Sequence, residues 1–163
     1  LWRVPFLNAN MIVYRHIPVD DKSVEAYGRA MEVARRGFAH GDVICFFPEN
    51  TRCVPGHRGF QRFHAMPFHT AFHDNVPILP IVFNDTDRVW PKGFWGLNVR
   101  ENILIQSLQP VYPKDFASTR ALMTHVRQVM LEQWERNQVE QDAARVALIN
   151  EQSQPSRLQT SSH

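Results

Sequence analysis

The sequence is short of cysteine, of net charge and of long hydrophobic runs. Its two cysteines, Cys45 and Cys53, are too few for a disulfide framework, and Cys45 lies in an apolar run typical of a small buried hydrophobe in a reducing compartment. A net charge of +2, with basic residues spread along the chain, argues against a nucleic-acid partner. No uncharged run approaches the roughly 20 residues that a membrane-spanning helix needs. With 44% hydrophobic residues, the composition is that of a globular domain.

Apolar patterns predict helices and strands in alternation. A helix is expected to begin at Val24, after Ser23 as N-cap, and to end at Gly41. The apolar run 43–47 is typical of an interior strand of a parallel sheet. Further strands are expected within 11–19, 77–83 and 103–108, and further helices at 67–75 and 121–140. The predicted fold class is α/β, with a central, mostly parallel sheet flanked by helices.

The two ends of the chain differ in character. Residues 1–140 are predicted to form one partial domain, incomplete at the N-terminus, because the sequence begins with Leu1 inside what looks like a structured segment. Residues 141–163 are predicted to be a C-terminal extension, disordered from about residue 151, where glutamine and serine dominate.

A long loop is expected at 48–63, directly after the run 43–47. Loops longer than about 12 residues in a compact domain are usually functional or disordered, and the ends of strands are where α/β sheets place ligand sites. In this loop the guanidinium fork of Arg52 suits a phosphate, Glu49 can orient Arg52 or accept a hydrogen bond, and Thr51 adds a hydroxyl. A structural ion pair between Glu49 and Arg52 is the alternative interpretation.

Two sequence runs resemble signatures of one enzyme family. Residues 46–52, Phe-Phe-Pro-Glu-Asn-Thr-Arg, resemble the F-P-E-G-T-R block of the 1-acylglycerol-3-phosphate O-acyltransferase family, and residues 76–81, Val-Pro-Ile-Leu-Pro-Ile, resemble its V-P-I-V-P-V block. The similarity extends over most of the chain, from Trp2 to Trp134. Asn50 replaces the family's glycine, and asparagine tolerates a left-handed backbone best among other residues. His64 replaces the family's lysine, which leaves a weaker positive charge at neutral pH.

The resemblance implies an O-acyltransferase of phospholipid biosynthesis that needs no cofactor. It implies transfer of a fatty acyl group from acyl-CoA or acyl-carrier protein to a lysophospholipid such as lysophosphatidic acid, at the cytoplasmic face of a membrane. Trp90 and the aromatic residues near it suit a membrane interface, and burial against the domain is the alternative. The resemblance assigns acceptor binding to the motif residues Glu49, Asn50, Thr51 and Arg52.

The resemblance implies a general base that is a histidine five residues before an aspartate, upstream of every segment described above, the predicted first strand included. The residues ahead of Met11 contain no histidine, so we interpret the motif as absent, assign no catalytic residue and expect this chain to be inactive by itself. His69 and Asp74 have the spacing but follow the acceptor motif. On a helix, positions five apart also lie about 140° around the axis, so this spacing is interpreted as chance.

Two other functions remain open. Without a base, the chain could be a catalytically dead module that binds a lipid phosphate. His69 and His73, four apart on an expected helix, also have a spacing found in metal sites, but no carboxylate or cysteine set accompanies them, so surface histidines are the favoured interpretation and no metal site is assigned.

Overall fold

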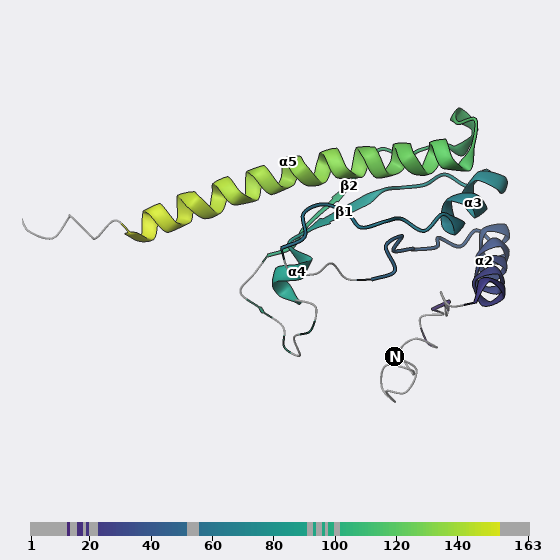
Figure 1. Cartoon of the computed structure of the whole chain (residues 1–163), viewed down its shortest axis with the longest axis horizontal. Coiled ribbons are helices and arrows are strands. Elements are labelled where there is room, and N and C mark those ends of the chain that lie inside the picture. The colour runs from purple at the N-terminus through teal and green to yellow at the C-terminus, as the bar shows by residue number, and fades with distance from the viewer. Residues whose placement is uncertain are drawn as a thin grey trace, which may run out of the picture.

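The structure, a computed structural model, describes residues 23–51, 56–90 and 102–153, together with eight single residues (13, 16, 17, 19, 93, 96, 98 and 99). Its helices are α2 (Val24–Ala39), α3 (Met66–His73), α4 (Thr86–Val89), α5 (Thr119–Ser153) and the 3-10 helix η1 (Pro113–Asp115), and its strands are β1 (Ile81–Asn84) and β2 (Leu104–Ser107). Figure 1 shows α5 lying along the strands, with its far end projecting beyond the body and α2 and α3 gathered at the other end.

Helix α2 forms where the sequence predicts it. The Ser23 hydroxyl accepts a hydrogen bond from the Ala26 N–H (3.2 Å), which caps the first turn, and Gly41 leaves the helix with φ of +83°. The buried stripe of α2 consists of Tyr27, Ala30 and Met31 and packs against Ile17, Phe46 and Met66. The predicted helices at 67–75 and 121–140 are also present, as α3 and as part of the longer α5.

The sheet differs from the prediction. The described residues form one two-stranded sheet in which β1 and β2 are antiparallel, with Val82 opposite Gln106 and Phe83 opposite Ile105. The predicted strands at 77–83 and 103–108 therefore exist in shortened form, and Ile78 adds an isolated antiparallel bridge to Val111. In the described part of the chain, the expected mostly parallel central sheet is wrong. The predicted strand within 11–19 falls largely outside the described residues.

The run 43–47 is extended but belongs to neither described strand, so its assignment as an interior strand is wrong for this part of the chain. Val43 is 97% exposed and Phe47 is 68% exposed, and Cys45 is an exposed free thiol where a buried one is expected. An apolar run becomes an interior strand only when neighbours on both sides supply backbone partners and when both faces are covered. The described residues provide neither for 43–47.

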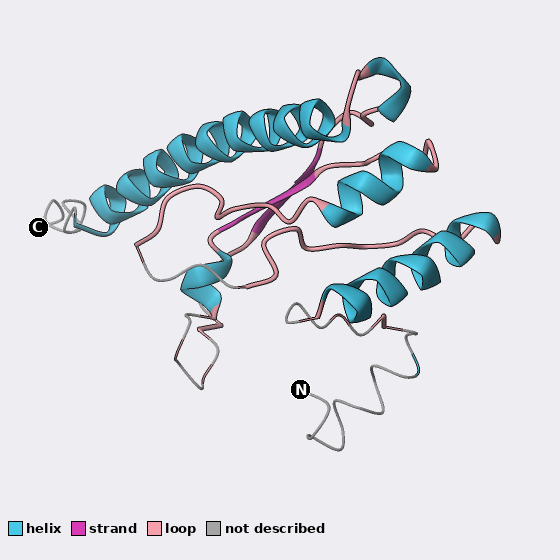
Figure 2. Cartoon of the chain, turned by 45° about the vertical axis from the view of Figure 1, so that its right-hand side comes forward, coloured by secondary structure: helices cyan, strands magenta, loops and turns pink. Residues whose placement is uncertain are grey.

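The core lies between the sheet and α5, the long helix that Figure 2 shows running over the strands. Along β1 the exposure alternates, so Val82 and Asn84 are buried while Ile81 and Phe83 are not. The buried cluster on the α5 side joins β1, α3 and the end of the long loop, and its members are Phe63, Phe68, Val82, Val111, Leu122, Val126 and Met130. The loop therefore ends inside the main core, which fixes its position.

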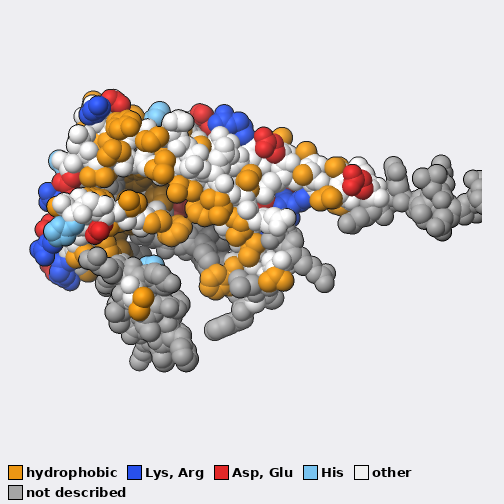
Figure 3. Space-filling model, turned by 180° about the vertical axis from the view of Figure 1, so that it is seen from behind, with side chains coloured by type: hydrophobic (Ala, Val, Ile, Leu, Met, Phe, Trp, Pro, Cys, Tyr) orange, Lys and Arg blue, Asp and Glu red, His pale blue; other side chains and the backbone are white. Residues whose placement is uncertain are grey.

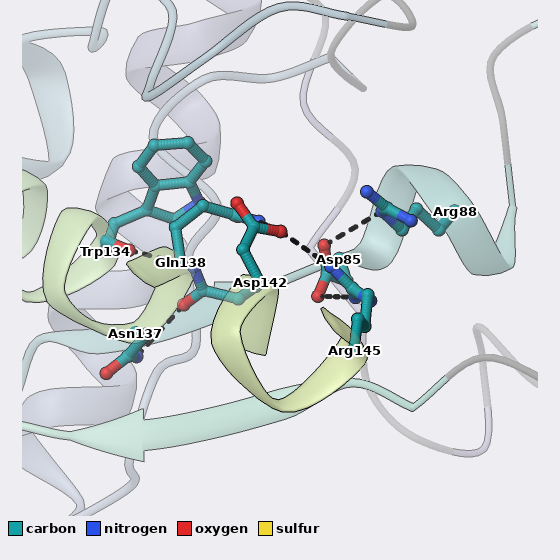
Figure 4. Close-up of polar contacts among 8 residues, drawn as sticks. Asp85, Arg88, Trp134, Asn137, Gln138, Asp142 and Arg145 are labelled. Carbon is teal, nitrogen blue, oxygen red and sulfur yellow. Dashed lines mark hydrogen bonds and ion pairs between the residues drawn. The ribbon is translucent and has the colours of Figure 1, made fainter. Parts of the chain in front are cut away.

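The second half of α5 is held by polar contacts to the end of β1. Asn137 Nδ2 donates to Asn84 Oδ1 (3.0 Å), and Asn84 Nδ2 donates to the carbonyl of Trp134 (3.0 Å). The next residue, Asp85, is buried and forms ion pairs with Arg88 and with Arg145 of α5 (Figure 4). Residues 154–163 of the predicted C-terminal extension lie outside the described residues.

Candidate functional site

The loop 48–63 is closed at its base by contacts between its two ends. The Gln61 N–H donates to Glu49 Oε2 at 2.7 Å, and the His64 N–H donates to the Pro48 carbonyl at 2.8 Å. A hydrogen bond with a charged acceptor is stronger than one between neutral groups. The two ends of the loop are therefore tied together beside the motif residues.

The motif residues occupy a turn at the start of the loop. Asn50 has φ of +53°, so the position where the family carries glycine keeps a left-handed backbone, as its replacement by asparagine predicts. Thr51 is exposed, which is compatible with contact to a ligand. Arg52, the predicted phosphate ligand, lies outside the described residues, as do residues 53–55. The structure gives Glu49 a task that the sequence pattern does not indicate, which is to hold the amide of Gln61.

Tyr27 of α2 lies beside this turn and is only 7% exposed. Its ring stacks with that of His64, with 6.4 Å between centroids. Its hydroxyl is buried and makes no hydrogen bond of ordinary geometry with another described residue. Burial raises the pKa of the Tyr27 hydroxyl above that of a free tyrosine, and the neighbouring side chain of Asn50 partly opposes this.

Helix α5 reaches the other end of the loop. Arg127 Nη2 donates to the carbonyl of Phe60 at 3.0 Å, and the guanidinium carbon lies 5.8 Å from the centroid of the Phe63 ring. Gly59 has φ of +81°, and a Cβ there would lie 3.0 Å from Leu131 Cδ1, so the loop passes close against α5. Sequence reasoning missed Arg127, because nothing in its helical spacing marks a partner 67 residues away.

His69 and Asp74 have separate partners in the structure. Asp74 accepts from Arg35 Nε of α2 at 2.8 Å, whereas the His69 ring lies tilted against that of His73, with 4.2 Å between centroids. These contacts support the interpretation of their spacing as chance. Among the described residues, no group of three or more histidine, cysteine, aspartate or glutamate side chains could hold a metal ion.

One pair upstream of the loop was missed. His16 stands five residues before Asp21, so the family's histidine–aspartate spacing does occur ahead of the acceptor motif, with the histidine in the predicted first strand and the aspartate just after it. A search for the spacing alone would have found it. The residues ahead of Met11 contain no histidine, so the absence of the family's motif stays a prediction. His16 is exposed, its neighbour Ile17 packs against α2, and Asp21 lies outside the described residues.

Part of the molecule's apolar surface is open to solvent. Figure 3 shows hydrophobic side chains gathered over the body of one face. Ile81, Phe83 and Ile105, on the face of the two-stranded sheet turned away from α5, are each exposed by a third or more, and Trp90 at the end of α4 is half-exposed. Within the described residues no helix is both long enough and apolar enough to cross a membrane.

Comparisons with known proteins identify relatives of this chain. A family model described as Acyltransferase matches residues 1–84, about half of the sequence. The chain is 29% identical over 89 residues to the chloroplastic 1-acyl-sn-glycerol-3-phosphate acyltransferase BAT2 of Brassica napus, covering 55% of this chain and 24% of that protein. It also matches the crystal structure of the 1-acyl-sn-glycerophosphate (LPA) acyltransferase PlsC from Thermotoga maritima with a TM-score of 0.72 and 25% identity, covering 85% of this chain and 54% of that one.

These matches confirm the resemblance read from the two signature runs, and the match to PlsC shows a similar fold over 85% of this chain. The chain spans about a quarter of the plant protein and about half of the bacterial one.

Proposed function

Since this chain belongs to the Acyltransferase family, we propose that it forms the acceptor-binding part of an enzyme that acylates a lysophospholipid such as lysophosphatidic acid. The acyl donor would be a thioester, either acyl-CoA or acyl-carrier protein. The relatives named as acyltransferases of acylglycerol phosphates support this choice of acceptor. The observation that carries it is the clamp between Glu49 and Gln61, which holds the signature loop closed at its base.

The chemistry assigns a distinct task to each motif residue. Arg52 would pair with the acceptor's phosphate through its guanidinium fork, and Thr51 and Asn50 would offer polar contacts to the glycerol part. The acceptor's free hydroxyl attacks the thioester carbonyl and loses its proton to a base, an ester bond forms, and the thiol leaves. Glu49 would keep the loop in the conformation that presents the acceptor, because its carboxylate is bonded to the Gln61 amide.

We further propose that the protein works at the cytoplasmic face of a membrane, where its lipid acceptor resides. The exposed apolar side chains Phe83, Ile105 and Trp90 support contact with a lipid surface, since large exposed apolar patches mark interaction sites. Trp90 has the mixed character, an apolar ring with a polar N–H, that favours membrane interfaces.

Binding of glycerol 3-phosphate, the water-soluble core of the acceptor, tests the assignment of the loop. Isothermal titration calorimetry of the chain 1–163 is expected to detect binding that Arg52→Ala weakens by about tenfold to a hundredfold, the ratio for losing a charge-assisted contact of roughly 1.5–3 kcal/mol. Arg58→Ala removes a cation from the same loop outside the motif and is the matched control. Equal losses in the two variants would show that the loop attracts anions only through its general charge.

A lipid-phosphate-binding module without catalysis is the second candidate. Its ground is the sequence, in which the residues ahead of Met11 contain no histidine. Both candidates predict binding of glycerol 3-phosphate, and only the enzyme predicts turnover. A protein that binds glycerol 3-phosphate but releases no coenzyme A from acyl-CoA in the presence of lysophosphatidic acid would support the module.

A further inference from the structure

We infer that Arg127, on a helix that lies outside the part matched by the family model, is a positioning residue for the acceptor loop. The inference rests on the proposed function for the statement that the loop binds the acceptor. That Arg127 holds the loop backbone rests on the contacts of the structure alone. Arg127 bonds to the loop at the carbonyl of Phe60, so it would act through the loop backbone. The family model matches residues 1–84, whereas Arg127 belongs to α5 (Thr119–Ser153).

The run that leads into the loop, 43–47, is paired with no described strand, and side-chain contacts hold it: Phe46 packs against α2, and the Phe47 ring lies 6.4 Å from that of Phe83. Backbone contacts tie the loop's start to the loop's end, through Glu49 to Gln61 and through Pro48 to His64. The position of the motif therefore depends in part on where residues 60–64 lie.

Residues 60–64 are fixed by contacts with α3 and α5. Phe63 is buried in the main core and stacks with Phe68 of α3, with 6.0 Å between ring centroids. Arg127 adds the polar part of the anchor, because its Nη2 donates to the Phe60 carbonyl at 3.0 Å while its guanidinium lies over the Phe63 ring. A cation over an aromatic face and a hydrogen bond to a partly buried carbonyl are both attractive interactions.

The hydrogen bond from Arg127 to the Phe60 carbonyl also sets an orientation. Phe60 lies directly before Gln61, whose N–H is the donor to Glu49. The carbonyl that Arg127 holds belongs to the same peptide unit as that N–H, because a peptide plane joins the C=O of one residue to the N–H of the next. Holding the Phe60 carbonyl therefore orients the Gln61 N–H toward Glu49. Arg127 and Glu49 thus bond to the two opposite polar groups of one peptide unit, the Phe60 carbonyl and the Gln61 N–H.

The experiment uses Arg127→Met, which keeps an unbranched apolar stem against the core and removes the donors. Arg136→Met, on the same helix, is the matched control, since Arg136 bonds to Gln133 of its own helix. Hydrogen exchange of the Gln61 amide is measured by NMR, and binding of glycerol 3-phosphate is measured by calorimetry. Thermal unfolding shows whether each variant remains folded.

In Arg127→Met we expect the Gln61 amide to exchange about five- to tenfold faster and glycerol 3-phosphate to bind more weakly by a similar factor, the scale of one lost hydrogen bond. Arg136→Met should match the wild type in both. Arg127→Lys, which restores a donor and a cation, should recover part of both effects. A role confined to general stability would lower the unfolding temperature without weakening ligand binding in the folded variant.

Unchanged exchange of the Gln61 amide in folded Arg127→Met would overturn the inference. The same holds if Arg136→Met accelerates that amide as much. Failure of the wild-type chain to bind glycerol 3-phosphate would refute the proposed function instead, and the exchange measurement would still decide whether Arg127 holds the peptide plane.

Discussion

Replacing Asn137 by alanine should be among the most destabilising polar substitutions in the chain. Asn137 and Asn84 are both almost fully buried, and the amide of Asn137 donates to Asn84 Oδ1 at 3.0 Å. Alanine removes that donor and leaves the Asn84 oxygen buried without it. A buried polar group stripped of its partner costs about 1–3 kcal/mol, so a loss of about 2 kcal/mol in the free energy of unfolding is expected.

The assay is urea unfolding followed by far-ultraviolet circular dichroism, with calorimetry as a second probe. For a domain of this size, about 2 kcal/mol corresponds to a fall in unfolding temperature of roughly 4–8 °C. Gln128→Ala is the control on the same helix, because Gln128 bonds to Glu132 on the exposed face. Its loss should stay within about 0.5 kcal/mol, as for other exposed i,i+4 pairs.

A double-mutant cycle separates the hydrogen bond from the lost volume. If the amide pair is responsible, Asn84→Ala combined with Asn137→Ala should cost less than the sum of the single variants, by about 0.5–3 kcal/mol. Strict additivity, or an Asn137→Ala variant as stable as Gln128→Ala, would refute the reasoning.

Three further outcomes are expected. In an active enzyme that carries this sequence, His69→Ala and Asp74→Ala should each keep turnover within a few-fold of wild type, and a drop of about a hundredfold would reveal a general base. The difference in unfolding free energy between wild type and Tyr27→Phe should be constant below pH 10 and should fall as the pH rises above it. The reason is that folding raises the pKa of Tyr27, so the folded state binds the proton more tightly than the unfolded chain. Urea titrations at pH 9–11 in which this difference does not change would contradict the expectation. The chain 1–163 should release no coenzyme A from acyl-CoA and lysophosphatidic acid, and release abolished by His16→Ala would place the base at His16.

Local features of the fold could be predicted because their causes are local. Ser23 caps α2 and Gly41 ends it through side-chain and backbone chemistry within a few residues. The left-handed turn at Asn50 follows in the same way from the residue type at one position of a recognised motif. The predicted strand at 103–108 appears as β2 because its own residues alternate in exposure, as the pattern of their side chains predicts.

Features that depend on distant neighbours could not be predicted. An apolar run such as 43–47 records that its side chains favour burial, but not whether partner strands are present or which way they run. The antiparallel direction of the pairing between β1 and β2 is likewise not recorded in the residues of either strand. The contact of Arg127 with Phe60 spans 67 residues, and a positive charge on an amphipathic helix usually faces solvent, so the pattern favours the wrong expectation.

The signature motifs and the scaffold that holds them lie in different parts of the sequence. The family model ends at residue 84, at the last residue of β1, yet β1 buries Val82 against Leu122 and Val126 of α5. Asn84 is bonded to Asn137, and Phe60 to Arg127. A chain cut at residue 84 would expose that face of β1 and leave the Asn84 side chain without its partners, so α5 belongs to the smallest unit in which the acceptor loop can keep its shape.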